Sequence, residues 1–229
     1  MKTDPQKVSN QVRTRRSSRE AILDAAELLM SKRGYNGVSI REIAGEASAN
    51  LGSVTYHFGT KENLLAEIYE RHCPPMNQRR MELLREAERI SNREECISAI
   101  VRSYIIPAFS SRSEEAGGGS QFTRVRAILA IEGNETARQI IAKNFDETNR
   151  AFVDAIARRI PEAPRESIVW RCHFLLGSLY YTLVNSERIS RMTVGTVDGT
   201  DFHAAMEELV RATTASFIEL EKGAPQKMN

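Results

Sequence analysis

Residues 38–65 read VSIREIAGEASANLGSVTYHFGTKENLL, and this stretch decides how the N-terminal part of the chain folds. Ser39 and Glu42 have the spacing of a capping box, which predicts the start of a short helix. Asn50 and Thr60 are residue types that favour the N-cap position, and each precedes another segment with apolar residues at helical spacing. The sequence therefore predicts two short helices joined by a tight break before Asn50, and a further helix that begins after Thr60.

A longer helix is expected upstream of this stretch. Ser17 and Glu20 form a second capping box, and Gly34 is a residue type that commonly ends a helix. One buried stripe is expected between them, formed by Ile22, Ala25, Ala26 and Leu29. A long helix followed by two short ones is the arrangement of a helix-turn-helix domain, whose last helix can enter a major groove. From this pattern alone, a plain helical hairpin is an equally good interpretation.

The remaining chain also has the pattern of helices. Apolar residues recur at intervals of three and four, and no sustained alternation predicts a strand. The fourth helix is expected to end or kink at Pro74 and Pro75, because a proline cannot donate the backbone hydrogen bond of a helix. Further helices are expected at about 77–90, 93–109, 121–132, 134–160, 165–189 and 201–222, with glycine-containing loops at about 110–120 and 191–200.

We therefore expect an all-α protein with three parts. Residues 1–16 are expected to form a mobile basic arm, residues 17–62 a three-helix DNA-binding domain with a helix-turn-helix, and residues 63–229 a helical bundle for ligand binding and dimerisation. The net charge is only +2, but residues 1–61 hold ten Lys and Arg against six Asp and Glu. This asymmetry favours an N-terminal end that faces DNA on a nearly neutral body.

Several classes of protein are disfavoured by the same sequence. It contains no nucleophile elbow, Walker loop, zinc-protease motif or dinucleotide fingerprint, so we expect neither an enzyme nor a bound cofactor. The three cysteines are widely spaced, and the pairs His72-Cys73 and Cys172-His173 are adjacent residues, so neither a disulfide framework nor a metal site is expected. No run of about 18 apolar residues occurs, and we expect a cytoplasmic protein without a membrane partner.

The segment from Val38 to Leu65 closely resembles the DNA-binding domain of the TetR family of bacterial transcriptional regulators. The resemblance covers about residues 18–68, and it includes Gly34-Tyr35, the Arg-x-Ile-Ala pattern of the second helix and the Tyr-His-Phe-x-x-Lys-x-x-Leu junction into the fourth. It implies a homodimeric repressor that binds double-stranded operator DNA and responds to a small effector. Thr55 departs from the family, which often has an aromatic residue there, so a contact made by a tyrosine ring is not carried over.

Ten residues of this segment are candidates for contact with DNA. The start and outer face of the third helix carry short side chains that permit close approach to base edges, and they are the candidates for specificity: Asn50, Leu51, Gly52, Ser53 and Thr55. Phosphate contacts are expected near helix ends, at Ser39, Arg41, Tyr56, His57 and Lys61. The resemblance also implies such roles for Tyr56 and Lys61. Purely structural roles stay open for Asn50 as a cap, Leu51 in packing and His57 as a hydrogen-bonding partner.

The C-terminal body is expected to bind a small hydrophobic effector. Its aromatic residues are candidates to line an apolar cavity, at Tyr104, Phe109, Phe122, Phe145, Phe152, Trp170 and Phe174. Arg124, Arg126 and His173 are candidate polar anchors for a carboxylate or a phosphate. Packing in the core is the alternative for each aromatic residue. The proline breaks in this body loosely resemble those of TetR regulators of lipid metabolism, which suggests a fatty acid or an acyl-CoA.

Two helices of the body are expected to form a dimer interface. The helix at 165–189 is apolar on most faces, and the last helix carries an apolar seam at intervals of four and three residues. Such helices need cover on several sides, so we expect the two helices of each subunit to form a four-helix bundle. The alternatives are a monomer whose core both helices close, and a DNA-binding dimer without any effector.

Overall fold

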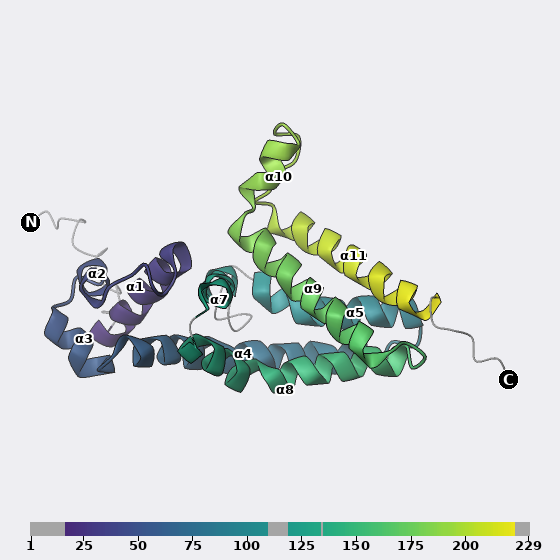
Figure 1. Ribbon diagram of the computed structural model, residues 1–229, viewed down its shortest axis with the longest axis horizontal. Helices are drawn as coiled ribbons and strands as arrows, with labels where there is room; N and C mark the ends of the chain where they lie inside the picture. Colours follow the sequence, from purple (N-terminus) through teal and green to yellow (C-terminus); the bar gives the residue numbers. More distant parts are fainter. Residues whose placement is uncertain (1–16, 110–118, 134, 223–229) are drawn as a thin grey trace, which may run out of the picture.

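The computed structural model describes residues 17–109, 119–133 and 135–222 of the chain (Figure 1). Within these ranges it contains ten α-helices and no strand, which confirms the predicted all-α class. The expected basic arm at 1–16 and most of the expected loop at 110–120 lie outside the described residues. The helices are α1 (Ser18–Arg33), α2 (Ile40–Glu46), α3 (Leu51–Phe58), α4 (Lys61–Ala87), α5 (Arg93–Phe109), α7 (Gly119–Glu132), α8 (Glu135–Arg159), α9 (Arg165–Val184), α10 (Glu187–Met192) and α11 (Phe202–Lys222).

Local capping rules fix the first four helices. Ser17 and Ser39 each form the predicted capping box with the glutamate three residues later. The side chains of Asn50 and Thr60 accept hydrogen bonds from the backbone N–H groups of Ser53 and Asn63, so α3 and α4 also begin where the sequence predicts. These caps set the angles between α1, α2 and α3, which lie together at one end of the molecule (Figure 1).

The turn between α2 and α3 closes with a left-handed residue. Ser48 has a φ of 51°, and its N–H donates to Gly45 O over 3.1 Å. The next N–H, from Ala49, donates to Ala44 O over 2.9 Å, and the two bonds together form a Schellman motif. This motif stops α2 within one residue and lets α3 start at Leu51 in a new direction.

The predicted end of the helix at Pro74 and Pro75 is wrong, because α4 continues from Lys61 to Ala87 with both prolines inside it. Both prolines lie on the solvent-exposed side of the helix, where water can satisfy the carbonyls that they leave without a donor. The residues on either side of them, Cys73 and Met76, are buried in the core with 1% and 0% exposure. Tertiary packing of the buried side of α4 therefore outweighs the tendency of proline to interrupt a helix.

We predict that the double variant Pro74→Ala, Pro75→Ala is more stable than the wild type by about 1–3 kcal/mol, because prolines inside a helix are costly. The change restores two backbone donors and touches no buried side chain. The free energy of unfolding in urea measures the effect. Pro161→Ala is the control, since that proline lies in the exposed turn after α8 and its replacement should give no gain. A loss of stability in the double variant would mean that the prolines fix a bend that the fold requires.

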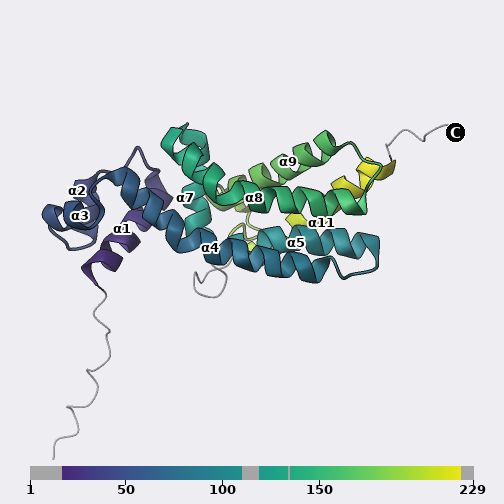
Figure 2. The ribbon, with the colours of Figure 1, turned by 90° about the horizontal axis from the view of Figure 1, so that it is seen from below.

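The body is a bundle in which α4 runs beside both α5 and α8, α9 packs on α8, and α11 packs on α5 and α9 (Figures 1 and 2). Its core includes Ile100, Ile105, Ile156, Leu179 and Phe217, all of which are fully buried. The predicted helix at 165–189 ends earlier, at Val184, and residues 187–192 form the separate helix α10. The chain turns between them at Asn185, so the predicted loop at 191–200 begins only after α10.

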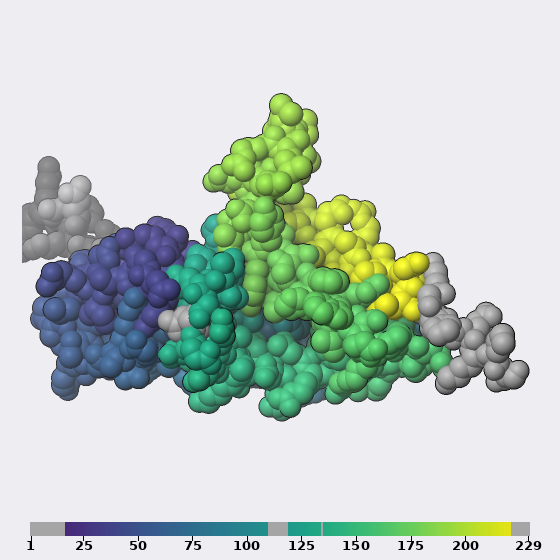
Figure 3. All heavy atoms as spheres, in the orientation of Figure 1, coloured from purple at the N-terminus to yellow at the C-terminus, as the bar shows by residue number. Residues whose placement is uncertain are grey.

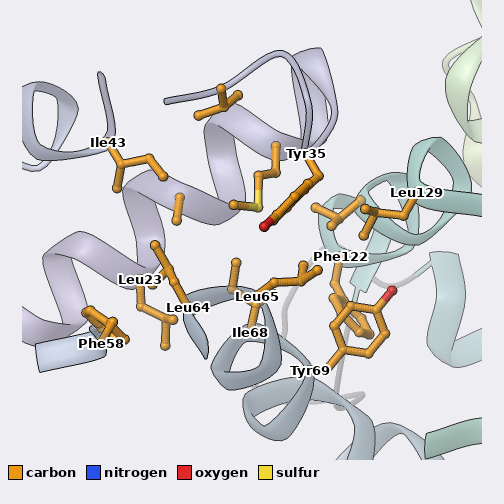
Figure 4. Close-up of a cluster of buried hydrophobic side chains, with 14 of the residues drawn as sticks. Leu23, Tyr35, Ile43, Phe58, Leu64, Leu65, Ile68, Tyr69, Phe122 and Leu129 are labelled. Carbon is orange, nitrogen blue, oxygen red and sulfur yellow. The ribbon is translucent and has the colours of Figure 1, made fainter. Parts of the chain in front are cut away.

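The predicted DNA-binding module, formed by α1, α2 and α3, shares one core with the adjoining parts of α4, α7 and α8, whereas most of the body has a separate core. Leu64, Leu65 and Ile68 of α4 pack between α1 and α7, and Phe122 and Leu129 of α7 lie in the same cluster (Figure 4). The rings of Tyr69 and Phe122 meet edge to face with centroids 5.1 Å apart. The two parts are therefore joined by α7 as well as by α4, because α7 packs directly against α1.

Candidate nucleic-acid interface and effector site

The outer face of α3 is open to solvent. Tyr56 is 86% exposed and Leu51 is 45% exposed, whereas Val54 and Phe58 on the inner face are 1% and 5% exposed. Gly52 and Thr55 are also exposed, and Ser53 is half-buried. The helix is thus held to the module by its inner residues while the predicted specificity residues face outward. A protruding helix with small side chains at its start can enter a major groove.

Two of the predicted specificity residues also have local structural partners. The Asn50 side chain accepts a hydrogen bond from the Ser53 N–H over 2.7 Å, so Asn50 acts as the N-cap of α3. The Thr55 hydroxyl donates to Leu51 O over 3.3 Å and keeps its lone pairs toward solvent. Asn50 orients the start of α3, and Thr55 has acceptor capacity left for a base edge.

The predicted phosphate contacts lie around the ends of α2, α3 and α4. Ser39 hydrogen-bonds Glu42 within its capping box, and Arg41 beside it is exposed with no carboxylate partner among the residues described. His57 is half-buried, with its ring edge to face with Tyr56 at 5.2 Å between centroids. Arg41 and Tyr56 are thus the side chains most open to a phosphate.

Lys61 is tied into the protein more closely than the sequence indicates. Its ammonium donates to Tyr35 O and lies 4.1 Å from the centre of the Tyr35 ring. Burial lowers the pKa of this ammonium from its ordinary value, although nearby carboxylates such as Glu132 oppose the shift. Lys61 therefore orders the turn after α1 in the free protein, and a phosphate contact would require its side chain to turn outward.

A carboxylate on α7 holds the same turn. Glu132 accepts the backbone N–H of Tyr35 over 3.0 Å and that of Asn36 over 3.2 Å. Gly34, at a φ of 75°, permits this close approach, because a Cβ there would lie 2.0 Å from the Glu132 carboxylate oxygen. No sequence motif indicates this contact, since the partners are more than 95 residues apart. It connects the last turn of α7 to the DNA-binding module.

A second polar contact between the two parts lies at the start of α7. The buried His72 Nε2 lies 2.7 Å from Glu27 Oε2, and the His72 ring stacks on Phe122 at 4.7 Å between centroids. Gln121 of α7 donates to the other oxygen of Glu27 over 3.2 Å. Both ends of α7 thus contact α1 or the turn that follows it.

The predicted ligand-binding residues fall into three groups. Tyr104, Phe152 and His173 line one small cavity of about 180 Å³ between α5, α8 and α9. Phe109, Phe122, Arg126 and Phe145 are buried elsewhere in the body. Trp170 and Phe174 lie on the outer face of α9, with 58% and 57% exposure. The tenth candidate, Arg124, is half-buried on α7, so the structure does not bring all ten residues to one site.

A larger hollow of about 930 Å³ lies between α5 and α11. Its lining mixes apolar residues such as Val210 and Ile218 with charged ones such as Glu94, Arg102 and Glu207, so it is a surface groove that is only partly apolar. The small cavity beside Tyr104 is better suited, because Phe152, Val153, Val169 and Leu176 contribute apolar walls. The Tyr104 hydroxyl donates to Asn149 Oδ1 over 2.8 Å at its edge.

One buried cation was not predicted. Arg80 of α4 is 2% exposed, and its Nε donates to Tyr104 O over 3.0 Å. The apolar spacing of α4 could have identified it, because Arg80 stands four residues after Met76 and four before Leu84, both of which are buried. An arginine on a buried stripe is a candidate functional residue.

No group of three or more His, Cys, Asp or Glu side chains that could hold a metal ion occurs in the described ranges. No helix in the part of the chain that the structure describes is long and apolar enough to span a bilayer.

Both parts of the chain match models of known protein families. Residues 22–68 match the family model described as bacterial regulatory proteins, tetR family. Residues 102–216 match the model described as the tetracyclin repressor-like C-terminal domain, and that match alone covers half of the chain. The two matches follow each other in the order of the DNA-binding module and the body.

Individual relatives agree with this assignment. The chain is 33% identical over 75 residues to the HTH-type transcriptional repressor NemR of Escherichia coli, a match that covers 33% of this chain and 38% of NemR. It is 42% identical over 50 residues to the HTH-type transcriptional regulator QacR of Staphylococcus aureus, covering 22% and 27% of the two chains. The aligned region is thus well under half the length of either relative.

The fold agrees over almost the whole chain. The structure of HlyIIR, a hemolysin II transcriptional regulator, superposes with a TM-score of 0.55 at 19% identity, covering 86% of this chain and 97% of that one. Members of the family are DNA-binding transcription factors that function as homodimers and have no enzymatic activity. The outward-facing α3, the bundle behind it and the two family matches together establish that the chain is a TetR-family transcriptional regulator.

Proposed function

We propose that this regulator is a homodimeric repressor that a small hydrophobic effector releases from operator DNA. The observation that carries the proposal is the core that α1 and α3 share with α4 and α7, with one end of α7 bonded to α1 and the other to the turn that follows it. An effector that displaces α7 would therefore change the position of the DNA-binding module. A ligand shifts such an equilibrium only by binding one arrangement better than the other.

The dimer in this proposal forms through α9 and α11. Val169, Trp170, Phe174 and Tyr181 are each about half-exposed on α9, which lies on an open face of the molecule with α11 beside it (Figure 3). Exposed aromatic residues at helical spacing favour burial against a second copy of the same surface. Two DNA-binding modules held one helical turn of DNA apart would then read two half-sites.

The effector in this proposal enters the body near the cavity beside Tyr104. Its walls are mainly apolar, which favours a hydrophobic ligand such as a fatty acid or the acyl chain of an acyl-CoA. A dimer that binds DNA without an effector is the alternative. A thermal-shift screen of small ligands distinguishes them, because only an effector-binding protein gains stability from a specific ligand.

Specificity in this proposal comes from the exposed face of α3. We predict that Thr55→Ala costs about 1–3 kcal/mol on the best operator and much less on random DNA, because a lost base contact affects only the matched sequence. Titration of both DNAs with wild type and variant gives the ratio. Tyr56→Phe is the control, since loss of a phosphate contact should weaken both complexes alike. Equal losses for Thr55→Ala on the two DNAs would remove Thr55 from the specificity residues.

The regulatory proposal is tested with a reporter gene placed under the selected operator. Repression by the chain and its reversal by one ligand from the thermal-shift screen are the expected results. Operator binding that no stabilising ligand alters would refute effector control while leaving the DNA-binding function intact.

A further inference from the structure

Two positive charges are buried side by side in the body. Arg80 of α4 is 2% exposed and Arg126 of α7 is 1% exposed. Burial lowers the pKa of Arg80 to about 10, and the positive charge of Arg126 acts in the same direction. Arg80 nevertheless remains charged at neutral pH, because this pKa lies well above 7.

Neither guanidinium has a carboxylate partner among the residues described. The Nη1 and Nη2 atoms of Arg80 and the Nε atom of Arg126 are buried without any hydrogen-bond acceptor. Arg126 Nη1 reaches only the sulfur of Met76, at 3.8 Å. Buried arginines are rare unless they are paired, because removing the hydration of each ion costs several kcal/mol of free energy.

Aromatic rings surround both groups. Arg126 Cζ lies 3.6 Å from the centre of the Phe145 ring, and Arg80 Cζ lies 5.7 Å from the same ring. Arg80 Cζ also lies 4.1 Å from the centre of Tyr104. Each such contact stabilises a cation by about 2 kcal/mol when both groups are desolvated, which is less than the cost of burying the charge. The rings hold the guanidiniums in place but leave their charge uncompensated.

The small apolar cavity adjoins this pair through Tyr104. The carbonyl of Tyr104 binds Arg80, its ring packs against the Arg80 guanidinium, and its side chain also lines the cavity of about 180 Å³. Pockets for drug-sized ligands usually measure about 300–1,000 Å³, so this cavity suits a small apolar body unless it expands on binding. If one ligand had its anionic group at the arginines and its apolar body in the cavity, the two groups would lie on opposite sides of Tyr104.

We propose that Arg80 and Arg126 form an anion-binding site for the effector, and that the effector is a small carboxylic acid with an apolar body. Two guanidinium forks in an apolar frame match the planar carboxylate, which accepts paired N–H bonds. The inference rests on the proposed function, because it names the chemical class of the ligand that releases DNA. It also places the ligand against α4 and α7, which both pack on α1 in the DNA-binding module.

Binding is tested with matched pairs of acid and alcohol on the full chain. Octanoate and 3-phenylpropionate are titrated against octanol and 3-phenylpropanol by calorimetry, with phenyl phosphate and inorganic phosphate as further arms. We expect at least one acid to bind more than tenfold tighter than its alcohol and to raise the melting temperature with concentration. Tighter binding of phenyl phosphate would move the site to organic phosphates, and equal binding of acids and alcohols would overturn the proposal.

Variants separate an anion site from a structural role. Arg80→Met and Arg126→Met should each weaken acid binding more than tenfold while the melting temperature of the free protein stays level or rises, because an unpaired buried charge is removed. Arg79→Met is the matched control, since Arg79 is partly exposed and pairs with Glu82 over 3.4 Å. Arg80→Lys and Arg126→Lys serve if the methionine variants fail to fold, and they should weaken acid binding because the fork is lost. A lower melting temperature with unchanged acid binding would make both arginines structural.

Operator affinity separates this inference from the proposed function. We expect the bound acid to release the operator from the wild type but not from Arg126→Met. This result would support both the anion site and effector control of operator binding. Release by a neutral ligand alone would overturn the acid site and leave effector control standing. Tight acid binding without any release would refute control by this ligand but not the anion site itself.

Discussion

Phe174→Asp is expected to convert the dimer to a monomer and to lower operator affinity by about 100-fold or more, because one half-site then binds alone. Phe174 and Trp170 are each more than half-exposed, and their ring centroids lie 5.7 Å apart on the outer face of α9. In a two-fold interface the same residue of both copies is buried, so each Asp variant places two charges in one apolar surface. Size-exclusion chromatography with light scattering and a gel-shift titration measure the two effects.

The control for this variant is Ile131→Asp. Ile131 is 81% exposed in the last turn of α7 and belongs to neither α9 nor α11, so it receives the same chemical change outside the proposed interface. It should remain a dimer with wild-type operator affinity. A dimer that survives Phe174→Asp would place the interface on another face of the body.

Glu132→Ala is expected to reduce the effect of an effector on operator affinity from about 5- to 150-fold in the wild type to less than about threefold. Its carboxylate is the acceptor for the backbone N–H groups of Tyr35 and Asn36 and joins α7 to the turn after α1. Without it, α7 keeps its contacts with α1 but loses its direct bonds to the turn that leads into α2, so a displacement of α7 is passed on less to the DNA-binding module. Operator affinity with and without saturating effector, and effector affinity without DNA, are the measurements.

Two further variants make this test specific. Glu135→Ala removes an exposed carboxylate three residues later, which pairs with Arg138 over 3.3 Å, and should leave coupling unchanged. Gly34→Ala should disrupt the same contact, because the added Cβ would overlap the Glu132 carboxylate. It should lower stability and coupling together. Full coupling in Glu132→Ala, with effector and operator still bound normally, would assign the signal to α4 or to the remaining contacts of α7 with α1.

The helix starts could be predicted from sequence because they depend on neighbours within three residues. Ser17, Ser39, Asn50 and Thr60 each cap the helix that follows, as their spacing indicates. The outward face of α3 also follows from its spacing, since Val54 and Phe58 are four residues apart on one side. Such rules are local and need no knowledge of the rest of the fold.

The features that sequence reasoning missed depend on tertiary contacts. The proline pair in α4 lies inside a helix because the buried neighbours Cys73 and Met76 hold both halves in one core. Glu132 binds the turn at Tyr35, which lies 97 residues earlier in the chain, and no spacing rule indicates this contact.

The aromatic residues of α9 could not be assigned to a pocket or an interface from sequence. The helix is apolar on most faces, so its periodicity does not distinguish the side that packs in the core from the side that faces outward. Leu175 and Leu179 prove to be buried, while Trp170 and Phe174 are exposed. The nearly continuous apolar pattern predicted that the helix needs cover on several sides, but not which side remains open in one subunit.

Selection of bound fragments from a random duplex DNA library tests the central claim most directly, namely that a dimer of this chain reads DNA through α3. We expect the enriched fragments to contain an inverted repeat whose half-site centres lie about 10–10.5 base pairs apart, or a multiple of that spacing. The selected site should bind at least about 10³-fold tighter than random DNA at physiological salt, and Thr55→Ala should relax the preference at fixed positions in each half-site. Enrichment of no inverted repeat, or equal affinity for selected and random DNA, would contradict the account.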